Sequence, residues 1–236
     1  MNKILNFILD LIFPKQCLGC GKDDLWLCKK CSHKIKYLKS QVCPICRTNN
    51  SGEVCSQCQT HTNLDGLLVA TNFNTPLIQK LIHNFKYKYI TDLKIPLTNL
   101  LVTTIDNYYK RFIIPNSENY IIIPVPLHKK RLRERGFNQS NLLAINLANK
   151  IKCKYYKNAL YRNRYTETQA RLTRKERIIN IKSAFNVNKS LDFINKNVII
   201  IDDVATTLST MEECAKVLKK SGANKVWGLV IARGDL

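Results

Sequence analysis

One segment decides the fold: Val198-Ile199-Ile200-Ile201-Asp202-Asp203-Val204-Ala205-Thr206-Thr207-Leu208-Ser209-Thr210. Four consecutive β-branched aliphatic residues predict a buried strand over 197–201. Two carboxylates stand at its end, and a hydroxyl-rich turn then opens a predicted helix over 207–220, with Ser209 and Glu212 at the spacing of a capping box. Ligands of open α/β sheets bind outside the carboxyl ends of the strands, so this turn is the first candidate site.

The residue types in this turn favour a particular class of ligand. Backbone N–H groups at a helix N-terminus form an anion site together with Thr and Ser hydroxyls. Carboxylates beside such a site can accept hydrogen bonds from sugar hydroxyls. A single Asp would be enough to cap a helix, whereas two Asp followed by several hydroxyl residues suit a ribose that carries a 5′-phosphate.

Outward from this segment, strand and helix patterns alternate. Apolar runs predict further buried strands over 67–73, 120–125 and 225–232, and helical spacing predicts helices over 76–85, 93–109 and 140–153. This alternation indicates an α/β fold, a mainly parallel sheet with helices on both faces. We place this domain at residues 63–236 and a separate N-terminal region at residues 1–62.

The N-terminal region is rich in cysteine. Eight of the ten cysteines of the chain form four Cys-x-x-Cys pairs, which are Cys17/Cys20, Cys28/Cys31, Cys43/Cys46 and Cys55/Cys58. Two such pairs complete a tetrahedral four-thiolate zinc site, so we expect two Zn²⁺ ions, whose binding supplies folding free energy to a segment with few aliphatic residues. Sequential pairing is the simplest arrangement, and a cross-braced one has compatible spacing. Cys153 and Cys214 stand alone in apolar patterns and are predicted to be core residues.

The N-terminal residues help to predict the cellular compartment. Residues 1–13 are apolar, but Asp10 interrupts them and no small-residue cleavage site follows, which does not favour a signal peptide. We expect a short helix that packs on the zinc module, with a membrane-surface anchor as the alternative. The cysteines then belong to a reducing cytoplasm, with a peripheral position at the inner membrane as the alternative. No apolar run reaches the ~18 residues of a membrane-spanning helix.

The charge of the chain points to an anionic partner. Lys and Arg number 38 against 17 Asp and Glu, a net charge of +21. Five basic residues fall within 129–135, directly after the strand at 120–125, and seven more fall within 162–182. Both segments are predicted to be loops. Guanidinium groups suit phosphate oxygens, so we assign pyrophosphate or a DNA backbone to Lys130, Arg131, Arg133, Arg135 and Gly136.

Four tyrosines lie between the two basic segments or within the second, at Tyr155, Tyr156, Tyr161 and Tyr165. Exposed rings can stack on the bases of a single strand. We favour an ordinary core or surface role for most of them, because tyrosine commonly places an apolar ring in the core and its hydroxyl at the surface.

The segment quoted first resembles the phosphoribosyl-pyrophosphate (PRPP) signature of type I phosphoribosyltransferases. The resemblance implies a fold of that type, with Asp202 and Asp203 on the ribose hydroxyls and Mg²⁺ bound together with PRPP. It implies that the 5′-phosphate is held by Thr206, Thr207, Ser209 and Thr210. One position departs from the signature, because Leu208 stands where the family usually has Gly, a residue that tolerates a positive φ.

The whole chain resembles the ComF family of late-competence proteins. The motifs, in order, are the paired cysteines, Phe85-Lys86-Tyr87, Val-Pro-Leu at 125–127 with Arg-Gly-Phe-Asn-Gln at 135–139, Thr-x-x-Gln and Glu-Arg-x-x-Asn within 166–180, and the Asp-Asp loop. The resemblance implies a cytoplasmic factor that assists the uptake of single-stranded DNA in natural transformation, next to the uptake machinery at the inner membrane.

Two alternatives stay open for the function. The first is an active phosphoribosyltransferase that uses PRPP and Mg²⁺ on an unknown acceptor, and the second is a non-catalytic PRPP-sensing module. Catalysis in the type I enzymes rests on positioning and on charge stabilisation as pyrophosphate departs, so no nucleophilic residue need appear in the sequence and none is assigned.

Overall fold

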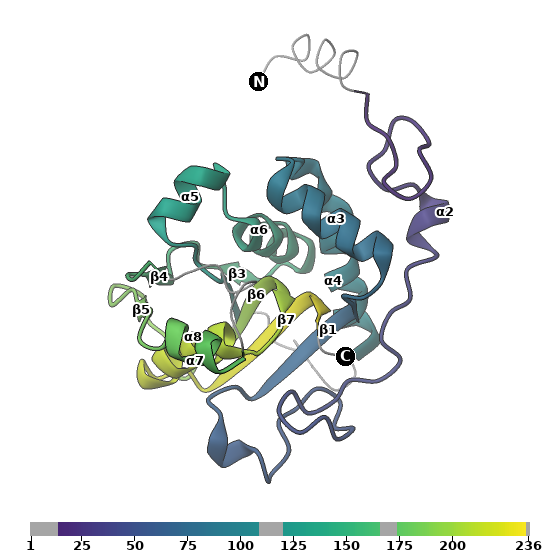
Figure 1. Ribbon diagram of the computed structural model, residues 1–236. Helices are drawn as coiled ribbons and strands as arrows, with labels where there is room; N and C mark the ends of the chain where they lie inside the picture. The colour runs from purple at the N-terminus through teal and green to yellow at the C-terminus, as the bar shows by residue number, and fades with distance from the viewer. Residues whose placement is uncertain (1–13, 109–119, 166–173, 235–236) are drawn as a thin grey trace.

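Five parallel strands form the central sheet of the computed structural model, which describes residues 14–108, 120–165 and 174–234 (Figure 1). Every neighbouring pair of strands runs parallel. From one edge of the sheet to the other, the strands are β1 (Gly66–Asn72), β7 (Lys225–Arg233), β6 (Asn197–Ala205), β2 (Tyr120–Pro124) and β3 (Lys154–Tyr155). The predicted mainly parallel sheet is therefore confirmed.

Helices cover both faces of this sheet (Figure 1). One face carries α3 (Pro76–Tyr87), α4 (Lys94–Tyr108) and α6 (Gln139–Ile151); the other carries α7 (Arg174–Ile181), α8 (Ser209–Lys220) and the antiparallel hairpin of β4 (Leu160–Arg162) and β5 (Phe185–Val187). Along β6, Ile199 and Ile201 pack on the face covered by α3, α4 and α6. Val198 and Ile200 pack on the face covered by α8. Alternate side chains point to opposite faces of a strand, so a strand buried on both faces needs an unbroken aliphatic run.

The topology places a crevice between β6 and β2. The chain leaves β6 through α8 to reach β7, and leaves β2 through α6 to reach β3 on the other side. These two crossovers diverge on opposite faces of the sheet, which opens a space at the carboxyl ends of both strands. The N–H of Val125 donates to the carbonyl of Ile201 at 2.9 Å, so the segment that follows β2 begins directly beside β6, next to Asp202.

The ends of β6 and α8 differ from those predicted. β6 continues past residue 201 to Ala205, because Ala205 still pairs with Arg233 of β7. The predicted capping box is wrong: Leu208 occupies the N-cap without a side-chain bond, and Glu212 accepts hydrogen bonds from the Thr62 hydroxyl and from the N–H of Asn63. A tertiary contact has therefore replaced a local one.

The basic segments are also more regular than predicted. Residues 129–135 form the short helix α5 (Lys129–Arg135), which ends at Gly136 with a φ of +67°. The second segment begins in β4 and ends in α7, and residues 166–173 between them lie outside the described ranges.

Residues 37–53 cover the free edge of β1. Antiparallel bridges join Tyr37 to Thr71 and Glu53 to Gly66. Between these bridges, the Gln41 side chain donates to the carbonyl of Val69 at 2.8 Å and accepts from its N–H at 2.9 Å. The amide of Gln41 thus takes the place of a neighbouring strand and satisfies edge groups that would otherwise be open to a second chain. These contacts cross residue 63, where the domain boundary stays a prediction.

Short helices complete the N-terminal region and the connection after α3. They are α2 (Lys29–Ser32), η1 (Gln59–His61) and η2 (Thr91–Leu93). None of the helices within the described ranges is long and apolar enough to cross a lipid bilayer. The helix predicted for residues 1–13 lies outside these ranges.

Replacement of Gln41 by Ala should destabilise the fold. The change leaves a buried N–H and a buried carbonyl of Val69 without their partner, so we expect a loss of about 2–4 kcal/mol in the free energy of unfolding. Urea denaturation of the zinc-loaded protein measures it. The matched control is Gln79→Ala on the exposed face of α3, with an expected change within about 0.5 kcal/mol; equal stability of the two variants would contradict the role of Gln41.

Candidate functional site

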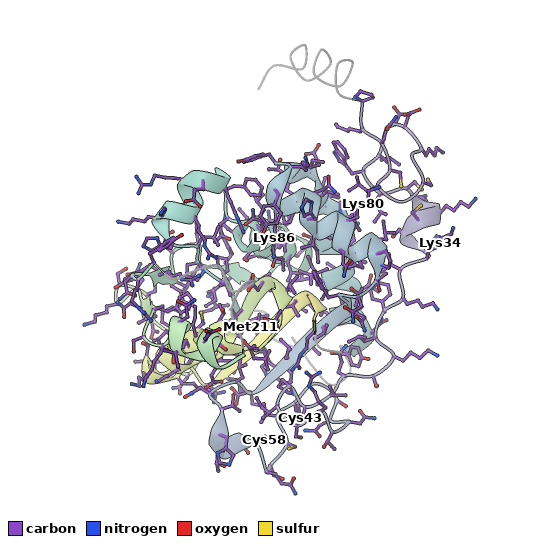
Figure 2. The ribbon with its side chains drawn as sticks, in the orientation of Figure 1. Lys34, Cys43, Cys58, Lys80, Lys86 and Met211 are labelled. Atoms are coloured by element: carbon purple, nitrogen blue, oxygen red, sulfur yellow. The ribbon has the colours of Figure 1, made fainter. Side chains whose placement is uncertain are left out.

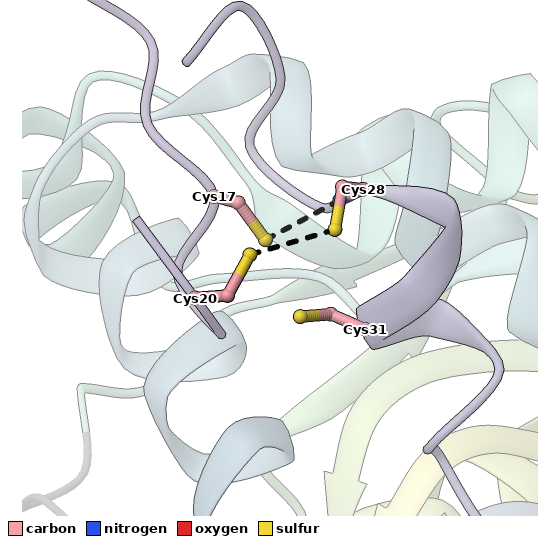
Figure 3. Close-up of side chains that lie close together, drawn as sticks. All are labelled: Cys17, Cys20, Cys28 and Cys31. Carbon is pink, nitrogen blue, oxygen red and sulfur yellow. Dashed lines mark hydrogen bonds between the residues drawn. The ribbon is translucent and has the colours of Figure 1, made fainter. Parts of the chain in front are cut away.

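The eight paired cysteines form two separate four-sulfur groups. One contains Cys17, Cys20, Cys28 and Cys31, and the other Cys43, Cys46, Cys55 and Cys58; the sulfurs of each group lie within 4.8 Å of one another. Figure 3 shows the side chains of the first group converging on a common centre. Sequential pairing is therefore confirmed over the cross-braced alternative.

The geometry of both groups fits Zn²⁺. Sulfurs at the corners of a tetrahedron with bonds of ~2.3 Å are about 3.8 Å apart. The Cys20 and Cys28 sulfurs are 3.7 Å apart, and those of Cys46 and Cys55 are 3.5 Å apart. Zn²⁺ held by four thiolates and no open position is a structural ion, so these eight residues would hold the metal and stabilise the N-terminal fold.

Backbone N–H groups prepare the sulfurs for a metal. The N–H of Cys28 donates to the Cys17 sulfur at 3.3 Å, and the N–H of Cys55 donates to the Cys43 sulfur at 3.5 Å, so the two groups repeat one local design. Burial disfavours the Cys17 thiolate, but the N–H groups around it outweigh burial and lower its pKa to about 6. Burial, followed by the neighbouring sulfurs, raises the pKa of Cys31 to about 12. Four neighbouring thiolates repel one another. A bound cation offsets this repulsion and holds the coordinating thiols deprotonated.

The two groups are attached to different parts of the α/β fold. The first packs on Leu77 of α3, and Gly19 is required there because a Cβ would lie 2.7 Å from the Cys31 sulfur. The second is tied to the end of β7, where the buried Arg233 guanidinium donates to the carbonyl of Pro44 at 2.8 Å. Of the two cysteines outside the Cys-x-x-Cys motifs, Cys214 is buried in α8, and the half-buried Cys153 donates to a backbone carbonyl.

The two adjacent carboxylates of β6 have different partners. Asp202 accepts hydrogen bonds from the Ser140 hydroxyl at 2.7 Å and from the N–H of Asp203 at 2.9 Å. Asp203 is buried and forms a 2.8 Å ion pair with Lys86, which reaches it from α3 (Figure 2). Lys86 was not among the residues assigned to the site. The only signal for it was the Phe-Lys-Tyr motif, because the contact depends on how α3 packs over the strand.

Burial is the main reason that the pKa of Asp202 is raised, to about 6, and the charge of Asp203 adds to it. Lys86 and the Ser140 hydroxyl act in the opposite direction. Holding the two carboxylates close together therefore costs free energy, and Lys86 and the Ser140 hydroxyl offset that cost only in part.

Contacts between helices enclose the crevice. The Arg135 guanidinium of α5 lies over the Tyr87 ring of α3 at 5.2 Å and donates to Gln139 at 3.2 Å. The Tyr89 hydroxyl donates to the carbonyl of Glu134 at 3.0 Å. Since Lys86 adjoins Tyr87 and Ser140 adjoins Gln139, these contacts continue into the bonds of the two carboxylates. The ends of α3, β6 and α5 and the start of α6 thus form one connected wall.

The hydroxyl-rich turn forms a depression of about 50 Å³ beside Asp202, lined by Thr206, Thr207, Ser209 and Thr210. The hydroxyls of Thr207 and Ser209 share a hydrogen bond of 2.7 Å. Leu208 adopts a φ of +63°, and its side chain is buried in the core under α8. The backbone therefore has the left-handed conformation that Gly would favour, at a cost of about 1–2 kcal/mol for a residue with a Cβ.

The basic residues assigned to pyrophosphate or DNA divide into two groups. Arg135 contacts Tyr87 and Gln139 beside the crevice, and Gly136 lines the larger cavity described below. On α5, Lys130 and Arg133 are exposed and Arg131 is half-buried. The Lys130 ammonium lies 4.7 Å from the Tyr165 ring. Arg162, within the second basic segment, was not singled out: burial, followed by the charge of Arg131, lowers its pKa to about 10.

A larger cavity of about 830 Å³ adjoins α5 on the side of the sheet edge formed by β3. Its walls include Lys129, Asn138, Lys157, Tyr161 and Arg162. The sequence does not indicate this cavity, because residues 157–163 meet residues 126–142 only in the folded chain.

Comparison with known proteins agrees with the two cysteine groups and finds relatives of the whole chain. Residues 8–63 match the family described as a double zinc ribbon domain. The chain is 31% identical over 207 residues to the DNA utilization protein YhgH of Escherichia coli (strain K12), covering 86% of this chain and 89% of the relative. It is 31% identical over 221 residues to Competence protein F of Haemophilus influenzae, covering 92% and 90%. The chain belongs to the ComF family.

Another ComF relative is Competence protein ComFC of Bacillus subtilis, 26% identical over 233 residues, with 94% of this chain and 91% of the relative covered. Among solved structures, a purine phosphoribosyltransferase from Pyrococcus horikoshii matches 59% of this ComF chain and 77% of its own, with a TM-score of 0.38 and 16% identity.

Metal analysis should find about two zinc ions per ComF chain, because each four-sulfur group is complete by itself. In the variant Cys58→Ser we expect one ion to remain, since the first group shares no ligand with the second. Cys153→Ser is the matched control and should retain two ions. One zinc in the unaltered protein would contradict the assignment of one of the two groups.

The variant Asp202→Asn should gain stability relative to the unaltered protein as the pH rises. A pKa of about 6 lies above the ordinary aspartate value of ~3.9, so the folded state binds this proton more tightly and loses stability between about pH 4 and pH 6. Asn removes this loss but keeps an acceptor for Ser140.

Urea denaturation at pH 5 and at pH 7.5 measures the difference, with Asp192→Asn on an exposed loop as the control. A difference between Asp202→Asn and the unaltered protein that is the same at both pH values would contradict the raised pKa.

Proposed function

We propose that this protein is a cytoplasmic competence factor that assists the handling of incoming single-stranded DNA in natural transformation and binds a PRPP-type ligand with Mg²⁺. The curated relatives named for competence and for DNA utilization support the biological part of this proposal. A peripheral position beside the uptake machinery at the inner membrane belongs to the same proposal.

The ligand part rests on one observation, the two carboxylates and the hydroxyl-rich turn at the mouth of one crevice. Asp202 and Asp203 would accept hydrogen bonds from the ribose hydroxyls. The N-terminus of α8 and the four hydroxyls at 206–210 would hold the 5′-phosphate. Arg135 and Gly136 would face the pyrophosphate across the crevice, and Mg²⁺ favours the oxygen ligands that phosphates and carboxylates supply there.

The DNA-handling part of the proposal rests on the charged surface beside the crevice. Lys129, Lys130 and Arg133 are exposed on α5, and the protein carries a net charge of +21. Cations that follow a phosphate backbone release its counterions, so binding of this kind weakens steeply as salt increases.

The second candidate function is an active transferase at the same crevice. Leu208, with its φ of +63° and buried side chain, keeps the turn in the shape that Gly would give, which supports ligand binding by a transferase and by a sensing module alike. A sensing module would bind PRPP at the same place without releasing pyrophosphate. Release of pyrophosphate from PRPP in the presence of an added acceptor separates the two.

Two variants should distinguish the PRPP site from the basic surface of α5 that is proposed to bind DNA. Asp203→Asn removes a charged acceptor from the crevice, so we expect at least ~10-fold weaker PRPP binding, about 1.5 kcal/mol, in calorimetry with Mg²⁺. The combined change of Lys130, Arg131 and Arg133 to Ala should leave PRPP binding intact. It should weaken the binding of a fluorescent oligothymidylate and lower its salt dependence by about 2 in slope.

The control for Asp203→Asn is Asp192→Asn, which should bind both ligands normally. An absence of calorimetric heat from the unaltered protein with PRPP and Mg²⁺ would remove the ligand part of the proposal. Unchanged oligothymidylate binding in the triple variant would remove α5 as a strand contact.

A further inference from the structure

The cavity of about 830 Å³ adjoins the proposed PRPP site at Gly136 and extends away from it. It lies between α5, the start of α6 and the turn that precedes β4, and shares none of its lining residues with the depression under the hydroxyl-rich turn. Cavities of ~300–1,000 Å³ are the size that takes small organic ligands. In Figure 1, α5 and β4 lie on the same side of the molecule, away from the zinc groups.

The charge of its walls selects an anion. Lys129, Lys157 and Arg162 line the cavity, and none of its described lining residues is an aspartate or glutamate. The Arg162 side chain is only 8% exposed, and its guanidinium lies 5.4 Å from the centre of the Phe185 ring. It is therefore fixed in place before a ligand arrives, and a planar guanidinium suits the oxygens of a phosphate.

The remaining walls suit a flat ring. Tyr161 is 49% exposed and Leu132 is 41% exposed, and Phe137 and Leu160 add apolar surface. An exposed aromatic ring beside fixed cations is the usual surface for a nucleobase, which stacks while its phosphate meets the charge.

Amide groups in the same walls can read the edge of a base. The amide of Asn138 is already in use, since it accepts from the N–H groups of Ser140 and Asn141 and donates to the carbonyl of Val125. Asn158 and Asn163 are exposed at the cavity and offer both a donor and an acceptor.

We propose that this cavity binds one unstacked nucleotide, with its base against Tyr161 and its phosphate against Lys129, Lys157 and Arg162. That this nucleotide belongs to a DNA strand rests on the function proposed above, and a free mononucleotide has the same chemistry. The cavity then holds the DNA strand at one defined position beside the PRPP site, whereas the basic residues of α5 outside the cavity contact only its backbone.

Fluorescence anisotropy with a labelled oligothymidylate of twelve nucleotides tests this proposal. Tyr161→Ala should weaken binding about 5- to 100-fold, the range for loss of one stacked base, and Tyr161→Phe should bind within about twofold of the unaltered protein because the ring remains. The combined change of Lys129 and Lys157 to Ala should lower the salt slope by about 1.4. Lys150→Ala, an exposed lysine in the last turn of α6, is the matched control and should leave the slope unchanged.

Titration with dTMP distinguishes the two sources of the nucleotide. Oligothymidylate binding that depends on Tyr161 assigns the cavity to a strand; dTMP binding that depends on Tyr161, with no oligothymidylate binding by the unaltered protein, assigns it to a free nucleotide and removes the strand part of the proposed function. If Tyr161→Ala binds both probes as the unaltered protein does, the cavity is not a nucleotide site, whatever the outcome with PRPP.

Discussion

The backbone hydrogen bonds that hold β6 between β7 and β2 are the constraint on which the rest of the structure depends. They keep the strand extended as far as Ala205, so the two acidic residues lie inside the ladder and not in a loop. Successive side chains of a strand point to opposite faces, which directs Asp203 towards Lys86 of α3, while Asp202 accepts a hydrogen bond from Ser140 at the start of α6. Different helices therefore supply partners to the two adjacent carboxylates, Lys86 from α3 and Ser140 from α6.

Local pattern was enough to predict most of the sheet and both cysteine groups. Aliphatic runs mark β2, β6 and β7 because parallel strands are buried on both faces, and Cys-x-x-Cys spacing fixes the ligands of a tetrahedral ion within one turn. Residues whose partners lie far away in the sequence could not be predicted in this way. Glu212 has the spacing of a cap but bonds to Thr62, and Lys86 meets Asp203 only after α3 has packed. The helical form of 129–135 was missed because those residues contribute little apolar periodicity, and none of them is buried.

The second cysteine group and the sheet support each other. Residues 37–53 satisfy the open edge of β1, and Arg233 joins the end of β7 to the loop between Cys43 and Cys46. An uncovered parallel edge is a site for unwanted pairing with other chains. Metal binding by the second cysteine group therefore also stabilises the sheet, because it fixes residues 37–53 along the edge of β1.

The bond from Glu212 to Thr62 and Asn63 has an evolutionary consequence. Glu212 lies in the first turn of α8, the helix whose N-terminus adjoins the hydroxyl-rich turn, and Thr62 follows the last cysteine ligand, Cys58, by four positions. These bonds tie the chain that follows the last cysteine ligand to the start of α8. An insertion after Cys58, or an exchange of the N-terminal ribbon between distant relatives, would displace the start of α8. Cysteine-rich and α/β halves joined in this way are expected to be inherited together, and recombination that separates them would be selected against.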